Sequence, residues 1–501
     1  MEKLLACDLG TGGVKASLFS KNGTSLAEVF LQYETFFPQE KHVEQRPMDW
    51  WNHVCKAISL LLSNSGTNAN EIGCVALSGH SLVAVPIGKN KELLSEQVPI
   101  WYDTRAHDVV SDFFLDLTFE EWYTATGNGD PEETYTIFKL MWMKKHQPEL
   151  FSKIYKVLGS KDFINFMLTG ELCTDPSYAS GFGVFHLKNW DYEDHFFKAA
   201  GISPAIFPEI RPSDEIIGHV TKEAASLCGL MEGTPVACGG VDNTCMALGS
   251  IGLLEGTAYT SLGSSSWIAV NSSEPIVDVN TRPFVFAHGK KGLYTSAVSI
   301  FSAGNSFRWV RDNLCRDLTA DTDAYELMNE MAKNVPPGSN GVMFNPTLAG
   351  GSAQEPSPDL CGGFMGLTLR NTREDLVRAS MEGIAMALKR TLNILMKQTT
   401  LSGEMLICGG GSKSKIWRQI FADIYQMPIT KTNIDQNAAS LGAAAMAANG
   451  CGIWNGYDII QDIHQQEDYT LPNIESVKIY ESLMPVFDEW IKYLAVLAQK
   501  L

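Results

Sequence analysis

The sequence predicts an α/β protein built from two domains, and three observations lead to this expectation. At 501 residues the chain is too long for one ordinary hydrophobic core. Segments with the two-residue period of strands alternate with segments that have the 3.6-residue period of helices. Two stretches, "ACDLGTGGV" near the start and "YTSLGSSSW" near the middle, share Leu-Gly, a hydroxyl residue and small residues between β-rich runs. This weak internal repeat suggests two similar domains, although two unrelated hairpins would explain it equally well.

The N-terminal segment predicts an antiparallel meander followed by helix–strand alternation. Asn22-Gly23 indicates a two-residue hairpin turn, because both residue types tolerate positive φ. Trp50 and Val54 belong to an apolar stripe with helical spacing. Strands are expected at residues 3–9, 13–20 and 71–79, and a helix is expected at 46–64.

The middle and the C-terminal half predict further alternation. A strand at "PVACGG" leads into Asp242, and the small-residue segment 243–250 is expected to be helical. Residues 372–398 carry a continuous apolar stripe at helical spacing, with Thr372 as the predicted N-cap. The remaining segments predict a strand, three glycines and a helix within 404–429, a closely packing small-residue helix at 437–450 and a final amphipathic helix that packs on the second domain.

The composition excludes several classes of partner. With 39 Lys and Arg against 57 Asp and Glu, neither nucleic acid nor an anionic membrane is an expected partner, because phosphate groups need clustered cations. No apolar run is long enough to span a bilayer, and the N-terminus lacks the pattern of a signal peptide. The eleven cysteines include no C-x-x-C pair and lie mostly among apolar neighbours, which predicts buried free thiols and a cytoplasmic location.

The stretch "ACDLGTGGVK", residues 6–15, is the first candidate for chemistry. A Gly-rich turn lets backbone N–H groups approach a ligand closely, and clustered N–H groups favour phosphate. A carboxylate beside phosphate is repulsive unless a cation lies between them. The combination therefore predicts a metal–nucleotide site in which Asp8 holds Mg²⁺ through water. The alternative is an ordinary hairpin that follows an Asp.

Asp242 and a run of three glycines are further candidates. Asp242 follows "CGGV", whose glycines leave room for a substrate, and Asn243 would lie at the start of the next helix. A carboxylate at this place could accept the proton of an attacking hydroxyl, or it could interact with the start of the helix. Gly409–Gly411 would let a purine lie against the backbone, or they would form a plain strand–helix turn.

Four motifs in order resemble those of a known family. "DLGTGGVK", "GGVDN", "SLGSSS" and "CGGGSKSKIWRQIFADIYQMPI" are similar to the first phosphate loop, the catalytic-aspartate motif, the second phosphate loop and the adenosine signature of the FGGY family of carbohydrate kinases. "VEQRPMDWW", "PIWYDTRA" and "GSKDFINFMLTGELCTD" resemble xylulokinase segments. The resemblance covers nearly the whole chain. It implies two ribonuclease H-like domains of the actin and hexokinase type, at 1–248 and 249–501, that face each other across a cleft.

The resemblance also implies an activity and roles for individual residues. It implies ATP-dependent phosphorylation of a small sugar, a ketose such as a pentulose, with Asp242 as general base and Asp8 as the carboxylate associated with Mg²⁺. The first domain would hold the sugar and the second the nucleotide. The residues expected at ATP are Gly10, Thr11, Gly12, Lys15, Gly263, Ser264, Ser265, Gly409, Gly410 and Gly411. The residues expected at the sugar are His80, Ser81, Leu82, Trp101, Asp103, Asp242 and Asn243.

The sequence departs from the xylulokinase pattern at the sugar segments. His80, Ser81 and Leu82 stand where xylulokinases usually carry Gln-Met-His-Gly, and "AGGSAQEP" lacks the Arg of the family's Gly-Glu-Arg segment. A sugar or polyol other than D-xylulose is therefore an open alternative. Trp101 could stack on a sugar and Asp103 could accept hydrogen bonds from its hydroxyls, or either residue could support the fold.

Three alternative functions remain at this point. A polyol kinase of the same family would share the mechanism. A non-catalytic sugar-binding or sensor protein on the same fold would not need both Asp8 and Asp242. A chaperone- or actin-like ATPase would lack the segments "PIWYDTRA" and "GSKDF". The expected partner is a small sugar or polyol, and a homodimer is left open.

Overall fold

The computed structural model describes residues 3–318, 323–434 and 437–500. Its contacts divide the chain into two compact units. Unit 1 comprises Met1–Leu253, Ser272–Thr295 and Asn437–Ile463, and unit 2 comprises Leu254–Asn271, Ser296–Gln436 and His464–Leu501. Both units are discontinuous in sequence, whereas the predicted domains, 1–248 and 249–501, are continuous. That boundary stays a prediction.

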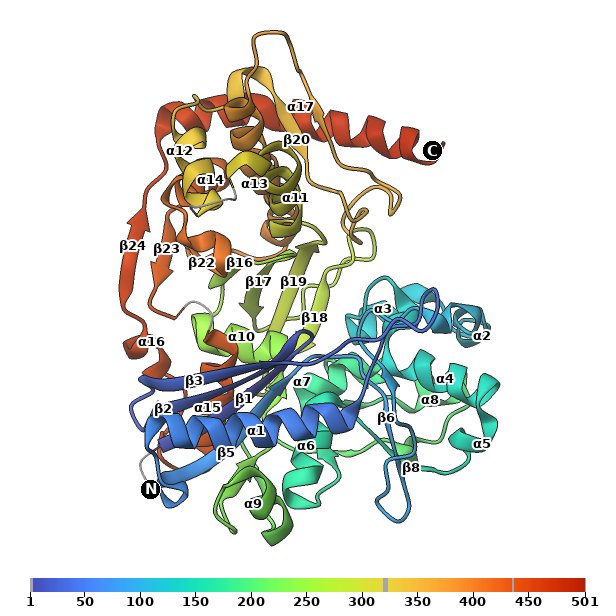
Figure 1. Ribbon diagram of the computed structural model, residues 1–501. Coiled ribbons are helices and arrows are strands. Elements are labelled where there is room, and N and C mark those ends of the chain that lie inside the picture. Colours follow the sequence, from blue (N-terminus) through green and yellow to red (C-terminus); the bar gives the residue numbers. More distant parts are fainter. Residues whose placement is uncertain (1–2, 319–322, 435–436, 501) are drawn as a thin grey trace. The chain divides into compact units, whose positions relative to one another are not determined.

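Unit 1 is built on a seven-stranded sheet (Figure 1). Its strands are β1 (Lys3–Gly10), β2 (Gly13–Ser20), β3 (Ser25–Gln32), β5 (Ile72–Gly79), β13 (Ile216–His219), β14 (Pro235–Ala237) and β15 (Gly240–Val241). They follow the order β13-β14-β5-β1-β2-β3, with β15 beside β5. β1, β2 and β3 form the predicted antiparallel meander. β5 lies parallel to β1, β14 lies parallel to β5, and β13 pairs antiparallel with β14.

The turn between β2 and β3 is longer than predicted. The Ser20 N–H donates to the Thr24 carbonyl over 2.9 Å, so three residues form the connection rather than Asn22 and Gly23 alone. Gly23 has φ +80°, in the left-handed region that glycine adopts without strain, and Asn22 does not share that region. One left-handed residue suits a three-residue loop, whereas the two-residue type I′ turn needs two.

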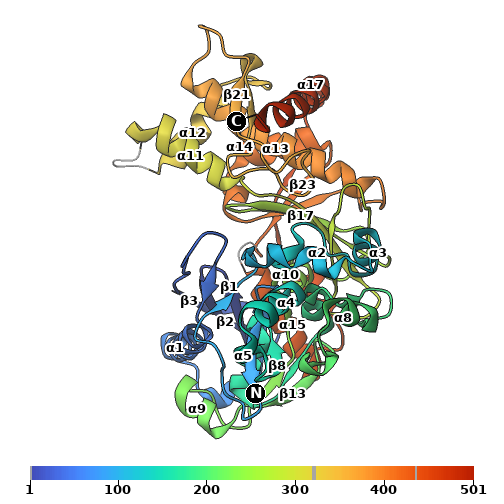
Figure 2. The ribbon, with the colours of Figure 1, turned by 90° about the vertical axis from the view of Figure 1, so that its right-hand side faces the viewer.

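Helices cover both faces of this sheet, and three of them position the site (Figures 1 and 2). They are α1 (Pro47–Ser65), α10 (Asp242–Ile251) and α15 (Ala438–Gly450). Trp50 and Val54 of the predicted α1 stripe are fully buried in one cluster with Leu5 of β1. Successive strand residues point to opposite faces, so Asp8 lies on the other face. α10 and α15 contact β1 and β5 on that face.

α10 and α15 pack unusually closely, as the small-residue pattern at 437–450 predicts. A Cβ added to Gly442 would lie 2.0 Å from the Cys245 carbonyl oxygen, and one added to Gly249 would lie 1.9 Å from the Ala438 carbonyl oxygen. Only glycine permits this approach at either position. Because α15 completes the layer beneath the unit 1 sheet, a segment from the C-terminal part of the chain belongs to unit 1.

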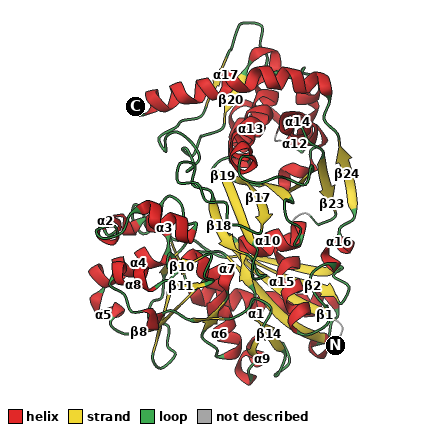
Figure 3. Ribbon diagram, turned by 180° about the vertical axis from the view of Figure 1, so that it is seen from behind, coloured by secondary structure: helices red, strands yellow, loops and turns green. Residues whose placement is uncertain are grey.

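The second seven-stranded sheet has most of its strands in unit 2 (Figure 3). Its strands are β16 (Ala258–Leu262), β17 (Ser266–Ser272), β18 (Phe284–Ala287), β19 (Tyr294–Ile300), β22 (Met405–Cys408), β23 (Ile429–Thr432) and β24 (Gln466–Thr470). The strand order is β18-β19-β17-β16-β22-β23-β24. β16 and β17 form an antiparallel hairpin, the pairs β16–β22 and β22–β23 are parallel, and β23–β24 is antiparallel.

The two sheets therefore repeat one strand order. The run β3-β2-β1-β5-β14-β13 corresponds to β19-β17-β16-β22-β23-β24, and the turns "GTGG" and "GSSS" join equivalent strands, β1–β2 and β16–β17. The weak sequence repeat is thus a repeat of architecture, and the alternative of two unrelated hairpins is wrong. The predicted α/β class is confirmed.

Helices of unit 2 also follow the predictions. They are α13 (Arg373–Met396), α14 (Lys415–Tyr425) and α17 (Ile474–Ala498). Thr372 is the N-cap of α13, and its N–H donates to Asp375 Oδ2 over 2.8 Å. The final helix, α17, contacts α13 and α14 within this unit. No helix within the described ranges has the length and apolar character needed to cross a bilayer. All eleven cysteines are free and most are buried, which confirms the prediction of free thiols.

Candidate active site

Asp8 and Asp242 lie at one edge of the unit 1 sheet. Asp8 of β1 is paired with Ser78 of β5, and Ser78 is also paired with Gly240 of β15. Since β1 and β15 both run parallel to β5, their carboxyl ends meet at the same edge, where Asp242 begins α10 directly after β15. Asp8 points to the face that α10 covers. Topology therefore makes neighbours of two carboxylates that are far apart in sequence.

The negative charge of Asp8 affects the protonation of Asp242. Burial raises the pKa of Asp242 to about 7, the negative charge of Asp8 contributes to the increase, and a hydrogen bond from the Asn243 N–H opposes it. That N–H lies 2.8 Å from Asp242 Oδ1. Burial also raises the pKa of Asp8, against a hydrogen bond from Ser78 Oγ at 2.7 Å and the charge of Lys15. A carboxylate that titrates near neutrality can accept a proton from a substrate under ordinary conditions.

The Gly-rich turn beside Asp8 is a two-residue hairpin loop. Gly10 and Gly13 form the last pair of the β1–β2 ladder, so Thr11 and Gly12 make the turn. Gly12 is exposed, and a Cβ added there would meet no atom within 4 Å, which leaves its backbone open to a ligand. At Gly13 the absence of a side chain serves packing instead, because an added Cβ would lie 2.4 Å from the Leu31 carbonyl oxygen of β3.

Thr11 and Lys15 are both held by neighbouring side chains. Gln45 Nε2 donates to the Thr11 carbonyl over 2.7 Å, and Trp101 Nε1 donates to Thr11 Oγ1 over 2.9 Å. Lys15 Nζ donates to Asn437 Oδ1 over 3.2 Å. The half-buried ammonium of Lys15 places a positive charge close to the Asp8 carboxylate.

His80 follows β5 and offers a buried acceptor. Its side chain is 1% exposed, and its Nδ1 lies 3.1 Å from the Leu9 carbonyl oxygen. A carbonyl can only accept, so Nδ1 carries the proton. Burial lowers the pKa of His80 to about 4, and the imidazole is therefore neutral near pH 7. Nε2 is buried and has no hydrogen-bond partner in the described part of the chain, so it could accept from a hydroxyl of a bound substrate.

Lys139, which the sequence analysis missed, joins the two segments where sugar contacts are predicted. It lies on α4 (Thr136–His146) and is fully buried. Its Nζ donates to the Leu82 carbonyl over 2.6 Å and to the Ile100 carbonyl over 2.7 Å. Leu82 has φ +61°, which is strained for a residue with a Cβ, and Ile100 directly precedes Trp101. The available signal was a single lysine inside the apolar run "TIFKLMWM".

The other residues predicted at the sugar differ in exposure. Asp103 is fully buried, and its carboxylate accepts from Arg105 Nε over 2.8 Å, from Arg105 Nη2 over 2.7 Å and from the Val43 N–H over 2.6 Å. These contacts favour the interpretation in which Asp103 supports the fold, and its role toward a substrate stays a prediction. Trp101, by contrast, is 42% exposed, while Ser81 and Asn243 are half-buried.

In unit 2, the second turn and the three glycines lie at one edge of the second sheet. β16 and β22 are parallel neighbours, with Ser261 paired with Cys408. The loop Gly263–Ser265 follows β16, and Gly409–Gly411 follow β22, so both segments emerge side by side. The predicted nucleotide residues of unit 2 are thus brought together, as are those of unit 1 around Asp8.

The loop after β16 is fixed by the start of α11 (Gly304–Leu314). The Gly304 N–H donates to the Gly263 carbonyl over 2.9 Å, and the Ala303 N–H donates to the Ser264 carbonyl over 3.0 Å. With these carbonyl groups occupied by the protein, the loop has a defined backbone conformation.

The three glycines after β22 have different surroundings. A Cβ on Gly409 would lie 2.7 Å from the Leu262 carbonyl oxygen, and one on Gly411 would lie 2.4 Å from Leu262 Cδ2, so both glycines allow packing against β16. A Cβ on Gly410 would meet no atom within 4 Å. Space for a ligand therefore exists at Gly410.

The helix after these glycines begins later than predicted. One 3₁₀ turn, Gly410–Lys413, separates the strand from α14, which begins at Lys415. Ser414 is the N-cap, and its side chain accepts a hydrogen bond from the Trp417 N–H over 3.2 Å. The glycines thus form a turn of their own instead of the first residues of the helix.

The Asp8 carboxylate fits a magnesium ion that is shared with phosphate. No group of three or more His, Cys, Asp or Glu side chains that could hold a metal occurs within the described ranges. Mg²⁺ commonly keeps several waters and uses one or two protein carboxylates together with substrate phosphates. Asp8, beside an open Gly-rich turn that could hold phosphate, supplies one such carboxylate.

Comparison with protein families gives two matches that together cover most of the chain. Residues 3–249 match the model of the FGGY family of carbohydrate kinases, N-terminal domain, and residues 258–451 match the C-terminal domain model of the same family. Both matches agree with the order of the motifs in the sequence.

Individual relatives agree with the family models over nearly their whole length. The xylulose kinase of Bacillus subtilis (strain 168) is 28% identical over 496 residues, which are 97% of this chain and 96% of the relative. The gluconokinase of the same organism is 27% identical over 492 residues, 97% of this chain and 94% of the relative. The crystal structure of gluconate kinase from Lactobacillus acidophilus has a TM-score of 0.91 at 26% identity and covers 99% of both chains.

These similarities confirm the predicted fold class, with two domains of the actin and hexokinase type, and they establish the reaction class as phosphoryl transfer to an alcohol group. On this evidence the chain belongs to the FGGY family of carbohydrate kinases.

Proposed function

We propose that the chain transfers the γ-phosphoryl group of ATP to a hydroxyl of a small ketose such as a pentulose, with Asp242 as the general base. The observation that best supports this proposal is the pair of carboxylates, Asp8 and Asp242, at one sheet edge beside an open Gly-rich turn. The similarity to a xylulose kinase supports a ketose as the acceptor.

Asp242 has the properties that a base for this reaction needs. A sugar hydroxyl is a weak nucleophile, and its proton must leave as the bond to phosphorus forms. A carboxylate within hydrogen-bond reach orients the hydroxyl and accepts this proton late in the transfer. A pKa of about 7 keeps a substantial share of Asp242 ionised near neutral pH and makes the carboxylate a stronger base than an ordinary Asp.

Asp8 would hold Mg²⁺ through water. Bound Mg²⁺ would neutralise charge on the phosphate oxygens. The backbone of Gly10, Thr11 and Gly12 would donate hydrogen bonds to phosphate, and Lys15 would add positive charge. In unit 2 we assign the loop Gly263–Ser265 to phosphate as well. Gly409–Gly411 are assigned to adenosine, with Gly410 closest to the adenine ring.

The acceptor site would be formed by residues after β5 and around Trp101. His80 Nε2 would accept from a substrate hydroxyl, Ser81 and Asn243 would add polar contacts, and the exposed ring of Trp101 would stack on the carbon chain. A sugar acid is a second candidate acceptor, because the similarity to a gluconokinase nearly equals the similarity to a xylulose kinase.

A coupled ADP-release assay tests the activity, with D-xylulose, D-gluconate and glycerol as separate acceptors. We expect the highest kcat/KM with the ketose. A higher kcat/KM with gluconate or glycerol would change the proposed acceptor but not the proposed reaction. If no acceptor stimulates ADP release although a sugar raises the melting temperature, the chain is a binding protein and the proposal is wrong.

Asp242→Asn tests the general base. The variant keeps the size of the side chain and should lower turnover by about two orders of magnitude or more, with a much smaller change in KM for ATP. Asp194→Asn is the matched control, because Asp194 is exposed and is also the first residue of a helix, α8 (Asp194–Ala200). Near-normal turnover in a folded Asp242→Asn variant would mean that another group accepts the proton.

A further inference from the structure

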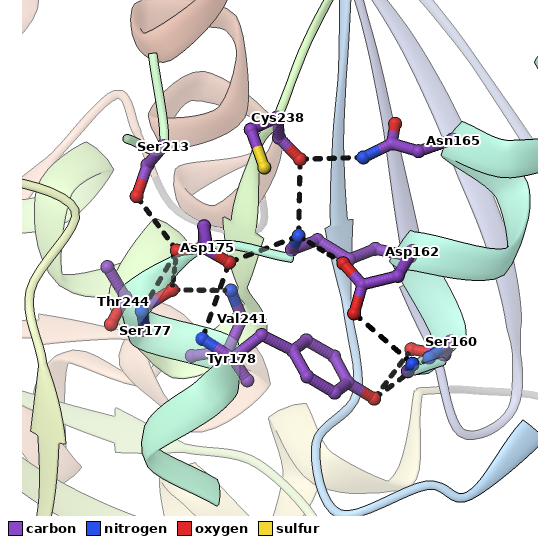
Figure 4. A network of polar contacts seen from close by, with 12 residues as sticks. Ser160, Asp162, Asn165, Asp175, Ser177, Tyr178, Ser213, Cys238, Val241 and Thr244 are labelled. Carbon is purple, nitrogen blue, oxygen red and sulfur yellow. Dashed lines mark hydrogen bonds and ion pairs between the residues drawn. The ribbon is translucent and has the colours of Figure 1, made fainter. Parts of the chain in front are cut away.

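A buried polar network contacts Cys238 and Val241, shortly before Asp242 in the sequence (Figure 4). Lys161, Asp175 and Ser177 are each 0% exposed. Lys161 Nζ lies 2.6 Å from Asp162 Oδ1 and 3.1 Å from Asp175 Oδ1, so one ammonium is shared by two carboxylates. Buried charges of this kind are costly unless each has partners, and the network provides them.

Asp175 fixes the direction of the Ser177 hydroxyl. Asp175 Oδ2 accepts hydrogen bonds from the Ser177 N–H at 3.0 Å, from Ser177 Oγ and from Ser213 Oγ at 2.8 Å. A hydroxyl has one proton. Because Ser177 gives that proton to the carboxylate, its oxygen is free to accept, and it accepts from the Val241 N–H over 3.0 Å.

Val241 is the residue on which the position of Asp242 depends. It is the N-cap of α10, and Asp242 is the first residue of that helix. The backbone just before it is intrinsically flexible, since Gly239 and Gly240 follow each other and Gly239 has φ +75°. Pairing with β5 restrains Gly240 and Val241, and the hydrogen bond from the Val241 N–H to Ser177 adds a side-chain contact to this restraint.

The network holds this glycine pair at both ends. Before the glycines, the Cys238 carbonyl accepts from Lys161 Nζ over 3.2 Å and from Asn165 Nδ2 over 2.8 Å. After them, the Val241 N–H is held by Ser177. A Cβ on Gly240 would lie 3.2 Å from Ser177 Oγ, so the same serine also lies close to the glycine backbone.

From these contacts we infer that Ser177, held by Asp175 and Lys161, is a positioning residue that fixes the Asp242 carboxylate for phosphoryl transfer. The inference rests on the proposed role of Asp242 as general base. Ser177 acts through the backbone of Val241 and has no contact with the substrate. Displacements of about 1 Å at a reacting group can reduce rates by about 10²-fold, so a single hydrogen bond at this place matters for turnover.

The test compares two serines that share one carboxylate. Ser177→Ala should lower kcat by about tenfold to a hundredfold, with the KM values for ATP and acceptor changed less than about threefold. Ser213→Ala is the matched control, because Ser213 is equally buried and bonds to the same Asp175 oxygen. It should keep kcat within about threefold while it loses a comparable amount of thermal stability. Equal losses of kcat in both variants, or no loss in either, would overturn the inference.

A double variant separates positioning of the base from a general structural effect. If Ser177 acts through Asp242, then Ser177→Ala should cause little further loss of kcat in the Asp242→Asn background. An equal fractional loss in both backgrounds would contradict the inference. If Asp242→Asn itself keeps normal turnover, the proposed function has failed instead, so the two failures are distinguishable.

A second substitution covers the case in which Ser177→Ala does not fold. Ser177→Cys has nearly the same shape, but its sulfur is a weak hydrogen-bond acceptor. It should reduce kcat by at least about threefold, whereas Ser213→Cys should not. Equal kcat in these two cysteine variants would also overturn the inference. The same variants of Ser177 and Ser213 can also be compared by their rates of ATP hydrolysis in the absence of a sugar.

Discussion

Asp242 should make the native protein less stable at neutral pH, and its replacement by Asn should reverse this cost. The pKa of Asp242 is raised from 3.8 to about 7, so the native state binds its proton more tightly than the unfolded chain does. The stabilisation from this group is fully present below pH 3.8 and is lost as the pH rises through about 7. Above pH 7 the native state must hold an ionised carboxylate beside Asp8.

The size of the effect follows from the two pKa values. The difference between 3.8 and about 7 corresponds to about 4 kcal/mol. Because Asp242 is half-buried and solvent screens part of the interaction, we expect Asp242→Asn to gain about 1–3 kcal/mol at pH 8. Asn keeps an oxygen that can accept from the Asn243 N–H. At pH 5 the gain should fall below half of its value at pH 8, since the native carboxyl of the wild type is protonated there.

Thermal melts of the ligand-free protein in EDTA at pH 5 and pH 8 measure this effect. Asp242→Asn should raise the melting temperature of unit 1 by about 2–6 °C at pH 8, and by less than half of that at pH 5. The control Asp194→Asn should shift it by less than about 1 °C at either pH, because Asp194 is exposed. An Asp242→Asn protein that melts at or below the wild-type temperature at pH 8 would refute the reasoning that the site opposes this charge.

Three further predictions concern metal, nucleotide and acceptor. Asp8→Asn should raise the Mg²⁺ concentration for half-maximal turnover by about tenfold. An unchanged dependence of turnover on Mg²⁺ would mean that Asp8 does not hold the metal. Gly410→Leu should raise KM for ATP about tenfold and leave the acceptor KM nearly unchanged, whereas equal loss of both in a folded variant would contradict an adenosine site. Lys139→Met should raise the acceptor KM by about tenfold or more, because the Leu82 and Ile100 carbonyl groups each lose a hydrogen bond. A folded Lys139→Met variant with the wild-type acceptor KM would contradict this positioning role.

Much of the fold could be predicted because its signals are local. The meander follows from the alternation around "ACDLGTGGVK", and α13 begins where Thr372 predicts. The turn at Asn22 and Gly23 was predicted one residue too short, since the sequence alone does not show which of two residues takes positive φ. The internal repeat was visible as a few shared residues, and only the strand order of the two sheets shows how far it extends.

The site was predictable where a residue follows a strand and less so where it acts through distant contacts. Asp8 and Asp242 each stand at the end of a buried strand, so parallel pairing brings them to one edge. Ser177 and Lys139 depend on hydrogen bonds to backbone groups far away in sequence, which no local pattern contains. Asp103 shows the opposite difficulty. It belongs to a segment that resembles a family motif, but its carboxylate already accepts hydrogen bonds from other groups of this chain.

The position of Asp242 at the start of α10 raises the question whether it serves the helix instead of the reaction. A carboxylate in the first turn gains about 0.3–1 kcal/mol from the helix dipole. Burial and the charge of Asp8 outweigh this gain, since the pKa is raised to about 7 in spite of it. The N-cap of α10 is Val241. Asp242 accepts a hydrogen bond from the Asn243 N–H, and an uncharged Asn at the place of Asp242 could accept it equally well. The helix start therefore gives only a small reason for an acid at this place, whereas the proposed role as general base requires one. On the proposal that Asp242 is the general base, the buried network around the glycines before Val241 serves to keep a destabilising carboxylate beside Asp8.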